Sequence, residues 1–262
     1  MTVTKNFKPK AIIFDKDGTL IDFDAMWGGW TVHLAEQLRL ACGIDVCHEL
    51  CMAFDIDESS NKVLAGGKLA SMPMSLLYNL TVEVMESFGF NLTNATEIVE
   101  QAWCIPDPVI LAKPLTDLRV LFAHLTEQGI KIAIATADDR APTQAMIEAF
   151  DIGEFISCIA CADDGLPSKP APDMALTLCA RMDVDPANAM VVGDTVSDLK
   201  MARASGAGLA VGVLSGVSSA KDLAGFADVL LESIDELNEY ALAFAENHSP
   251  QTKSGLNPDF AF

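Results

Sequence analysis

The sequence predicts an α/β fold: a parallel sheet covered by helices on both faces, with a helical domain inserted after its first strand. Two observations support this fold class. From residue 113 onward, short apolar runs alternate with segments of helical periodicity, which is typical of a mostly parallel sheet. The apolar run Ala11–Phe14 belongs to the same pattern, but a helical stretch of about 85 residues separates it from the next predicted strand.

Each element of the core is bounded by local signals. The strands are expected over residues 11–14, 131–136, 155–162, 189–193, 209–213 and 228–231. The helices that alternate with them are expected over residues 115–128, 142–150, 171–182, 197–205 and 234–245. In the first of these helices the apolar stripe recurs every 3.6 residues and is ended by Gly129; its members are Leu118, Leu121, Phe122 and Leu125.

The insert, residues 22–107, has a helical pattern almost throughout. Its two clearest apolar stripes are Trp30, Leu34, Leu38 and Ala41, and Leu77, Leu80, Val84 and Phe88. Ser71 and Pro73 are the expected N-cap and first turn of the second stripe's helix. The predicted domains are a core of residues 1–21 and 108–246, an all-helical insert of residues 22–107, and a polar, aperiodic tail of residues 247–262 that is expected to be disordered.

Charge and composition exclude several classes of protein. The chain has 262 residues, of which 17 are basic and 37 acidic, giving a net charge of −20. This balance argues against nucleic acid as the main partner, and an anionic substrate would need local positive groups to hold it. No apolar run reaches the roughly 18 residues of a membrane helix, so we expect a soluble, cytoplasmic protein without a membrane partner.

The seven cysteines lie mostly in apolar surroundings, which favours reduced thiols over a disulfide framework. Cys158 and Cys161 have a CxxC spacing, and Cys47, His48 and Cys51 lie close together in the sequence. A zinc site would need a second matched pair of ligands, and the sequence offers none. We therefore do not expect zinc.

Polar side chains follow the ends of several predicted strands. Asp15 and Asp17 follow the first strand, and an alternating strand would direct both carboxylates to one face, where they repel. In open α/β sheets ligands bind at the carboxyl ends of the strands, so the polar residues there should share one crevice. The residues that this rule brings together are Asp15, Asp17, Thr136, Lys169, Asp194 and Asp198.

Clustered carboxylates are tolerated when a cation lies among them. Oxygen ligands without histidine suit Mg²⁺, which binds one or two carboxylates together with a substrate phosphate. A carboxylate can also attack phosphorus, while a second acid protonates the leaving oxygen and later activates water. Lys169 and the Thr136 hydroxyl would hold the phosphoryl oxygens. This chemistry explains why two neighbouring acids follow the first strand.

Four ordered motifs resemble those of the haloacid dehalogenase superfamily of phosphohydrolases. They are DKDGTL at residues 15–20, ATA at 135–137, KP at 169–170 and GDTVSD at 193–198. The resemblance implies a Rossmann-like core, a helical cap placed after the first motif, and the activity of a phosphoric monoester hydrolase. The phosphoglycolate phosphatase-like members are the most similar in their DGTL sequence and cap position. Lys16 stands where the family often has an apolar residue, and its backbone N–H can still serve phosphate.

The resemblance also implies the role of each residue. Asp15 is the expected nucleophile and Asp17 the general acid/base. Gly18, Thr136, Ala137 and Lys169 are the expected phosphate-binding residues. The expected ligands of Mg²⁺ are the Asp15 carboxylate, the Asp17 backbone carbonyl and the Asp194 carboxylate, with Asp198 supporting them.

The substrate and the exact reaction stay open at this stage. The expected reaction is hydrolysis of a small phosphorylated metabolite, with 2-phosphoglycolate as one candidate, by a monomer or homodimer. A phosphomutase with the same acids and a non-catalytic binding module on this fold are the alternatives; Asp17 argues against C–halogen hydrolysis. Within the cap, Lys68 is a candidate for binding a second anionic group of the substrate, and a solvated lysine after a glycine C-cap is the alternative. Trp27 and Trp30 are interpreted as cap core rather than as a substrate platform.

Overall fold

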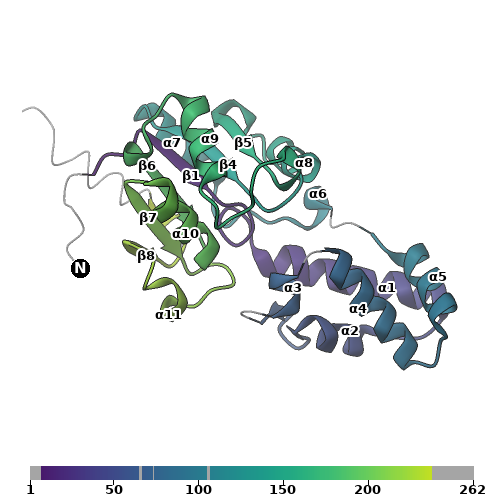
Figure 1. Ribbon diagram of the computed structural model, residues 1–262. Coiled ribbons are helices and arrows are strands. Elements are labelled where there is room, and N and C mark those ends of the chain that lie inside the picture. The colour runs from purple at the N-terminus through teal and green to yellow at the C-terminus, as the bar shows by residue number, and fades with distance from the viewer. Residues whose placement is uncertain (1–6, 65–66, 73, 105–106, 238–262) are drawn as a thin grey trace, which may run out of the picture.

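The computed structural model describes residues 7–64, 67–72, 74–104 and 107–237, and its core is a parallel six-stranded sheet between helices (Figure 1). The strand order is β5-β4-β1-β6-β7-β8. The strands are β1 (Ala11–Phe14), β4 (Lys131–Ala135), β5 (Ile156–Ala160), β6 (Ala189–Gly193), β7 (Leu209–Val213) and β8 (Val229–Leu231). The predicted fold class is thereby confirmed, and β1, β6 and β7 have the predicted bounds.

The first strand lies at the centre of the sheet and is buried on both faces. It pairs in parallel with β4 and β6, with Phe14 opposite Ile134 on one side and Val192 on the other. Ile12 and Phe14 contribute to one apolar cluster, and Ala11 and Ile13 contribute to the cluster on the opposite face. Because both faces are covered, the strand is apolar throughout instead of alternating.

Helices cover both faces of the sheet. They are α7 (Leu118–Glu127), α8 (Arg140–Ala149), α9 (Asp173–Met182), α10 (Val196–Ser205) and the short α11 (Ala220–Leu223). The first of them begins three residues later than predicted, because the Asp117 side chain accepts a hydrogen bond from the Val120 N–H and caps it. Of the helix predicted over 234–245, the residues after 237 lie outside the described part of the chain, as does the predicted tail.

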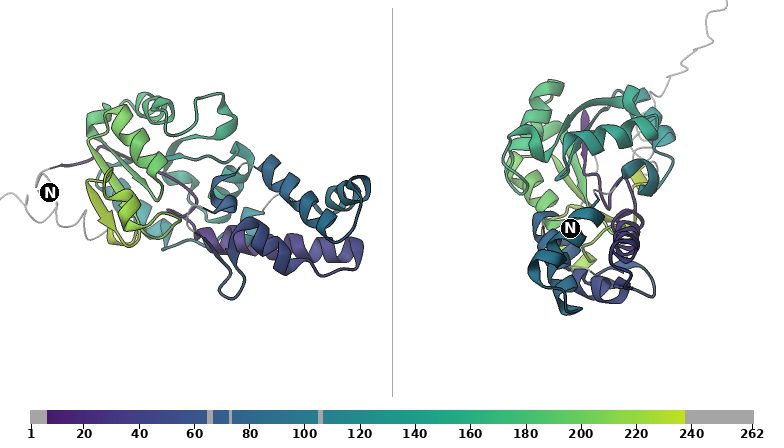
Figure 2. Two further views of the ribbon diagram at one scale, coloured as in Figure 1. Left: turned by 60° about the horizontal axis from the view of Figure 1, so that its bottom comes forward. Right: turned by 90° about the vertical axis from the view of Figure 1, so that its right-hand side faces the viewer.

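The insert leaves the core just after β1 and returns before α7, and it extends from one end of the sheet (Figures 1 and 2). It consists of a π-helix, η1 (Asp24–Gly28), and the helices α1 (Gly29–Cys42), α2 (Cys47–Phe54), α3 (Lys68–Ser71), α4 (Met74–Ser87) and α5 (Leu92–Ala102). The short helix α6 (Pro108–Leu111) follows the insert and packs mainly on α8 of the core. The expectation of an all-helical insert is wrong in one detail. Two-residue strands, β2 (Ile56–Asp57) and β3 (Lys62–Val63), form an antiparallel hairpin that is too short to produce a period.

The insert has an apolar core of its own. Trp30 is fully buried, lies parallel to Phe54 at 5.9 Å between ring centroids, and meets Trp103 edge-on at 5.5 Å. Leu34 and Leu38 are buried as predicted, whereas Ala41 is exposed. Ala41 lies in the last turn of α1, which ends at Cys42 and is followed by a left-handed Gly43. Ser71 is the last residue of α3 rather than the N-cap of α4. Pro73, the other half of that prediction, lies outside the described residues.

Candidate active site

The first motif begins where β1 leaves the sheet. The Asp15 N–H still donates to the Val192 carbonyl oxygen, at 2.8 Å, and so extends the pairing with β6 by one residue. The chain then turns sharply, because the Lys16 carbonyl oxygen accepts hydrogen bonds from the N–H groups of Leu20 and Ile21. The turn leaves the Asp15 carboxylate at the carboxyl end of the central strand, as predicted.

Gly18 has no room for a side chain. Its φ of +80° is a left-handed conformation that glycine adopts without strain. A Cβ built there would lie 2.6 Å from Asp194 Oδ2 and 2.9 Å from the Gly216 Cα. The first motif and the carboxyl end of β6 are therefore in close contact at this point.

Lys169 connects two of the predicted acids. Its ammonium lies 2.5 Å from Asp15 Oδ1 and 2.6 Å from Asp198 Oδ1, and its side chain is only 7% exposed. Burial disfavours the charged ammonium, but the two carboxylates outweigh this and hold the pKa of Lys169 above its ordinary value. The lysine therefore stays protonated between the two acids.

Asp194 is fully buried at the carboxyl end of β6. It accepts hydrogen bonds from the Val217 N–H at 2.9 Å and from the Thr19 hydroxyl at 3.4 Å, both of them neutral donors. Among the described residues no lysine or arginine forms an ion pair with it. Burial, with the neighbouring Asp15 and Asp198, raises its pKa well above the ordinary value. A buried carboxylate in this setting requires a proton or a cation.

Asp198 has two structural partners. It is the third residue of α10, and its Oδ2 accepts from the Thr195 N–H at 3.0 Å and hydroxyl at 2.5 Å, while the Thr195 hydroxyl oxygen accepts from the Asp198 N–H. This is a capping box with aspartate in the place of glutamate. Its other oxygen, Oδ1, meets Lys169. Asp198 thus orients the lysine, and its predicted support of a metal stays a prediction.

The three acids fit a magnesium ion. One carboxylate oxygen each from Asp15, Asp194 and Asp198 can be chosen so that all lie within 4.8 Å of one another. Hard, anionic oxygen ligands are those that Mg²⁺ prefers, and the buried carboxyl group of Asp194 forms no ion pair in the described chain. The backbone carbonyl of Asp17, the remaining predicted ligand, stays a prediction.

Thr136 lies just after β4, where its N–H donates to the Ala160 carbonyl oxygen at 3.0 Å. Its hydroxyl oxygen accepts from the Asp138 N–H at 3.0 Å and retains a proton to donate. The next residue, Ala137, is exposed in the loop, so its backbone is accessible. Thr136 and Ala137 thus lie at the predicted position, at the carboxyl end of β4, and their binding of phosphate stays a prediction.

Asp17 has a partner that the sequence did not reveal. The ammonium of Lys16, whose side chain is fully buried, lies 2.8 Å from Asp17 Oδ2 and 2.9 Å from Oδ1. The same ammonium lies 2.8 Å from Asp138 Oδ2, in the loop after β4. Burial raises the pKa of Asp17, and the adjacent Lys16 lowers it by a smaller amount. From the sequence, only the backbone N–H of Lys16 was expected to contribute to the site, and no local signal indicated Asp138.

Trp27, in η1 of the insert, lies near the Asp17 carboxylate. Its indole nitrogen is buried and finds no acceptor in hydrogen-bond geometry among the described residues, yet it is close enough to the Asp17 carboxylate to lower that group's pKa. The ring packs against both the core cluster and the insert cluster, and it is stacked on Phe23 at 6.1 Å. The prediction that Trp27 belongs to the cap core is therefore incomplete, because the residue spans both parts. Trp30 does lie in the core of the insert.

Lys68 is engaged within the insert. Its ammonium donates to the Ala53 carbonyl oxygen at 3.2 Å and lies 3.8 Å from Asp55 Oδ1. The predicted glycine C-cap is wrong, since Gly67 precedes α3 as its N-cap and Lys68 is the first residue of that helix. The described contacts do not bring Lys68 together with the carboxylates of the core.

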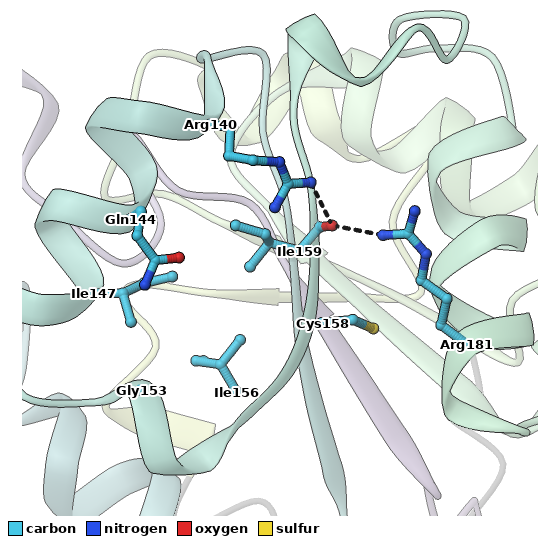
Figure 3. Close-up of a pocket in the computed structure, with 8 residues that line it drawn as sticks. All are labelled: Arg140, Gln144, Ile147, Gly153, Ile156, Cys158, Ile159 and Arg181. Atoms are coloured by element: carbon cyan, nitrogen blue, oxygen red, sulfur yellow. Dashed lines mark hydrogen bonds between the residues drawn. The ribbon is translucent and has the colours of Figure 1, made fainter.

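A hollow of about 350 Å³ lies elsewhere, on the edge strand β5 between α8 and α9 (Figure 3). Arg140 and Arg181 approach it from opposite sides and both donate to the Ile159 carbonyl oxygen, at 3.4 and 3.1 Å. None of the acids of the motifs lines it. The candidate active site is the cluster of Asp15, Asp194 and Asp198 rather than this hollow, because charge, burial and convergent polar groups occur together at the cluster.

Fold and site together define a hydrolase of the α/β class with an aspartate at the end of its central strand. The family model of haloacid dehalogenase-like hydrolases matches residues 9–206. The chain therefore belongs to the haloacid dehalogenase-like hydrolase family. Within the described residues, no helix combines the length and the apolar character that crossing a membrane requires.

Several characterised and solved relatives agree with this membership. The chain is 22% identical over 202 residues to N-acetylmuramic acid 6-phosphate phosphatase of Pseudomonas aeruginosa, covering 77% of this chain and 80% of that one. It is 22% identical over 197 residues to phosphoglycolate phosphatase of Aquifex aeolicus, covering 75% and 81%. A HAD-superfamily hydrolase of subfamily IA from Geobacter sulfurreducens superposes with a TM-score of 0.64 at 18% identity, covering 91% of this chain and all of that one. A putative β-phosphoglucomutase from Thermotoga maritima gives 0.62 at 19% identity, covering 88% and 97%.

Proposed function

We propose that this protein is a Mg²⁺-dependent phosphatase that hydrolyses a small phosphorylated metabolite through an aspartyl-phosphate on Asp15. The observation that carries the proposal is the convergence of Asp15, Lys169 and Asp194 in one buried cluster. Lys169 supplies the local positive charge that a dianionic phosphate needs in a chain of net charge −20. Relatives named as phosphatases support the same reaction class.

The residues divide the reaction between them. A carboxylate oxygen of Asp15 attacks phosphorus, the bond from phosphorus to the ester oxygen breaks, and Asp17 gives its proton to that leaving oxygen. Asp17 then accepts a proton from the water that attacks the aspartyl-phosphate, which releases inorganic phosphate and restores Asp15. Lys169, Thr136 and the backbone N–H of Ala137 would hold the phosphoryl oxygens. The Gly18 N–H, also predicted to bind phosphate, already donates to the Ile21 carbonyl oxygen at 2.8 Å and would have to leave it.

A magnesium ion would be held by Asp15, Asp194 and the Asp17 carbonyl, with Asp198 supporting them. When bound, it neutralises charge on the phosphoryl oxygens and on the acids. EDTA should therefore abolish turnover and added Mg²⁺ should restore it. Ca²⁺ should substitute poorly, since its larger and looser coordination shell misplaces the nucleophile. Full activity in metal-free buffer would contradict the metal dependence.

For the substrate, we propose a phosphate ester that also carries a carboxylate. The names of two relatives contain such compounds, phosphoglycolate and N-acetylmuramic acid 6-phosphate, which makes 2-phosphoglycolate the first substrate to test. Lys68 would have to leave Ala53 and Asp55 to reach this carboxylate. Lys68→Ala should then raise KM for carboxylated esters without affecting an uncharged aryl phosphate; equal kinetics would remove Lys68 from the site.

A phosphomutase is the second candidate, and the fold shared with a putative β-phosphoglucomutase favours it. One experiment separates the candidates: a panel of phosphorylated metabolites is incubated with Mg²⁺, and both free phosphate and phosphoryl-transfer products are followed by ³¹P NMR. Free phosphate supports the phosphatase, whereas transfer without release supports the mutase. Neither product would favour a binding module on this fold. A cytoplasmic monomer or homodimer without a nucleic-acid partner remains part of the proposal.

A further inference from the structure

Lys16 and Asp138 form an ionic group beside the general acid, and the proposed reaction does not use either side chain. The group consists of Lys16, Asp17 and Asp138. The Lys16 ammonium makes three contacts, to both oxygens of Asp17 and to Asp138 Oδ2, all between 2.8 and 2.9 Å. The lysine side chain is 0% exposed, whereas those of Asp17 and Asp138 are 16% and 24% exposed.

The contacts determine what Lys16 can and cannot do. An ammonium has three N–H donors, and three carboxylate oxygens already lie at hydrogen-bonding distance from this one. It therefore has no donor left for a phosphoryl oxygen. Lys169 differs, because its two carboxylate contacts leave it one donor. Of the two lysines, Lys169 is suited to bind substrate and Lys16 is suited to hold Asp17.

The Asp17 carboxylate needs such a support because of where it lies. It lies three residues beyond the end of β1, in the turn that Gly18 and Ile21 close through a 2.8 Å hydrogen bond. Asp17 forms an isolated bridge with Ile21 and belongs to no helix or longer strand of the described chain. Asp138 comes from the loop after β4, so the lysine links the first motif to the loop of the second. Without the ammonium, Asp17 and Asp138 would be two like charges in a partly dry site, and they would repel each other.

We propose, given the phosphatase activity inferred above, that Lys16 and Asp138 position the Asp17 carboxylate for proton transfer to the leaving oxygen. The ammonium holds both oxygens of Asp17, and Asp138 holds the ammonium. A general acid acts only when its proton lies within hydrogen-bond reach of the leaving oxygen, so a displaced carboxylate loses this step. Nucleophilic attack by Asp15 does not depend on the support, because Asp15 is held by Lys169.

The test compares leaving groups in Lys16→Met, which keeps the length of the buried stem and removes the charge. The quantity compared is the single-turnover rate of leaving-group release, because hydrolysis of the aspartyl-phosphate, which also uses Asp17, is common to both substrates. For an alkyl phosphate, whose leaving oxygen must be protonated, this rate should fall about 10- to 100-fold, a part of the full effect of a positioned acid. For p-nitrophenyl phosphate, whose leaving group needs no proton, it should fall about threefold or less, and KM should stay within about twofold for both. The control Lys131→Met removes a lysine at the opposite end of β4, where its ammonium contacts the Met182 carbonyl oxygen. Lys131→Met should leave the rates and the KM values for both substrates at the wild-type level.

Every outcome decides between positioning and a merely structural role. Equal losses on both substrates, or a loss seen mainly in KM, would overturn the proposal. If Lys16→Met does not fold, Asp138→Ala replaces it, with an expected alkyl-selective loss of about 3- to 10-fold, and the same criterion applies. Wild-type protein that hydrolyses neither ester would contradict the phosphatase itself. Wild-type turnover with no leaving-group dependence in either variant would contradict only the role of Lys16.

Discussion

The ammonium of Lys169 lies 2.5 Å from Asp15 although 154 residues separate them in the sequence. The same ammonium holds Asp198, so one lysine compensates two buried acids while a third, Asp194, lies beside them. Lys169 and the proposed magnesium ion would therefore together balance the charge of these acids.

Lys169→Met should destabilise the metal-free protein by about 3–5 kcal/mol, because it leaves buried carboxylates without their ionic partner. Mg²⁺ should recover part of this loss, since it binds the same acids. Chemical denaturation with and without Mg²⁺ measures both effects. Lys68→Met is the matched control: its side chain is 41% exposed, and its loss should cost less than about 1 kcal/mol. Equal effects of the two substitutions would contradict the proposed role of Lys169.

Asp15→Asn should abolish turnover and leave the fold intact. The amide cannot attack phosphorus, while Lys169 keeps its second partner, Asp198. Turnover of a phosphorylated substrate and the thermal unfolding midpoint should be measured on the same preparation. An activity within tenfold of the wild type would rule out Asp15 as the nucleophile.

Binding of Mg²⁺ should release protons and strengthen as the pH rises. Burial, opposed by Lys169 and assisted by Asp198, raises the pKa of Asp15 from 3.8 to about 7 in the metal-free protein. Because the folded pKa exceeds the unfolded one, this group stabilises the metal-free fold at low pH and loses that contribution as the pH rises from about 4 through about 7. A metal must displace the proton, so affinity should rise over the same upper range and level off above about pH 8.

Calorimetry in two buffers with different ionisation enthalpies measures this release. Protons should be released at about pH 6 and far fewer at about pH 8.5. Asp194, whose pKa is also raised by burial, should contribute in the same direction. Metal affinity that is independent of pH across this interval would show that the acids are already ionised.

Trp27→Phe and Trp30→Phe form a matched pair. Trp30 donates its indole N–H to the Cys104 carbonyl oxygen at 2.9 Å and is fully buried, so its replacement leaves an unpaired carbonyl and a cavity and should cost about 2–4 kcal/mol. Trp27 has a buried N–H without a hydrogen-bonded acceptor in the described chain, so losing it should cost less than about 1 kcal/mol. Denaturant unfolding of both variants gives the comparison. A larger cost at Trp27 would show that its N–H is satisfied in solution.

Much of the fold follows from short-range signals in the chain. The bounds of β1 and β6 were predictable because their apolar runs lie between polar residues, Lys10 and Asp15 for β1 and Asn188 and Asp194 for β6. The acids after β1 and β6 were predictable as a cluster, because the carboxyl ends of parallel strands meet at one edge of a sheet. Burial of a strand and the position of its end depend mainly on residues within the run itself.

The contacts that complete the site were not predictable in this way. Lys16 next to two acids has no pattern that indicates a buried ammonium, and its second partner, Asp138, lies more than 100 residues away. Trp27 comes close to Asp17 from a π-helix that leads from the core into the insert, and no local pattern indicates this proximity. The hairpin of β2 and β3 is too short for a period. Local periodicity thus determined the strands and the acids at their ends. Tertiary packing decided which lysine holds which acid, because a side chain's partner depends on the distant segments that fold against it.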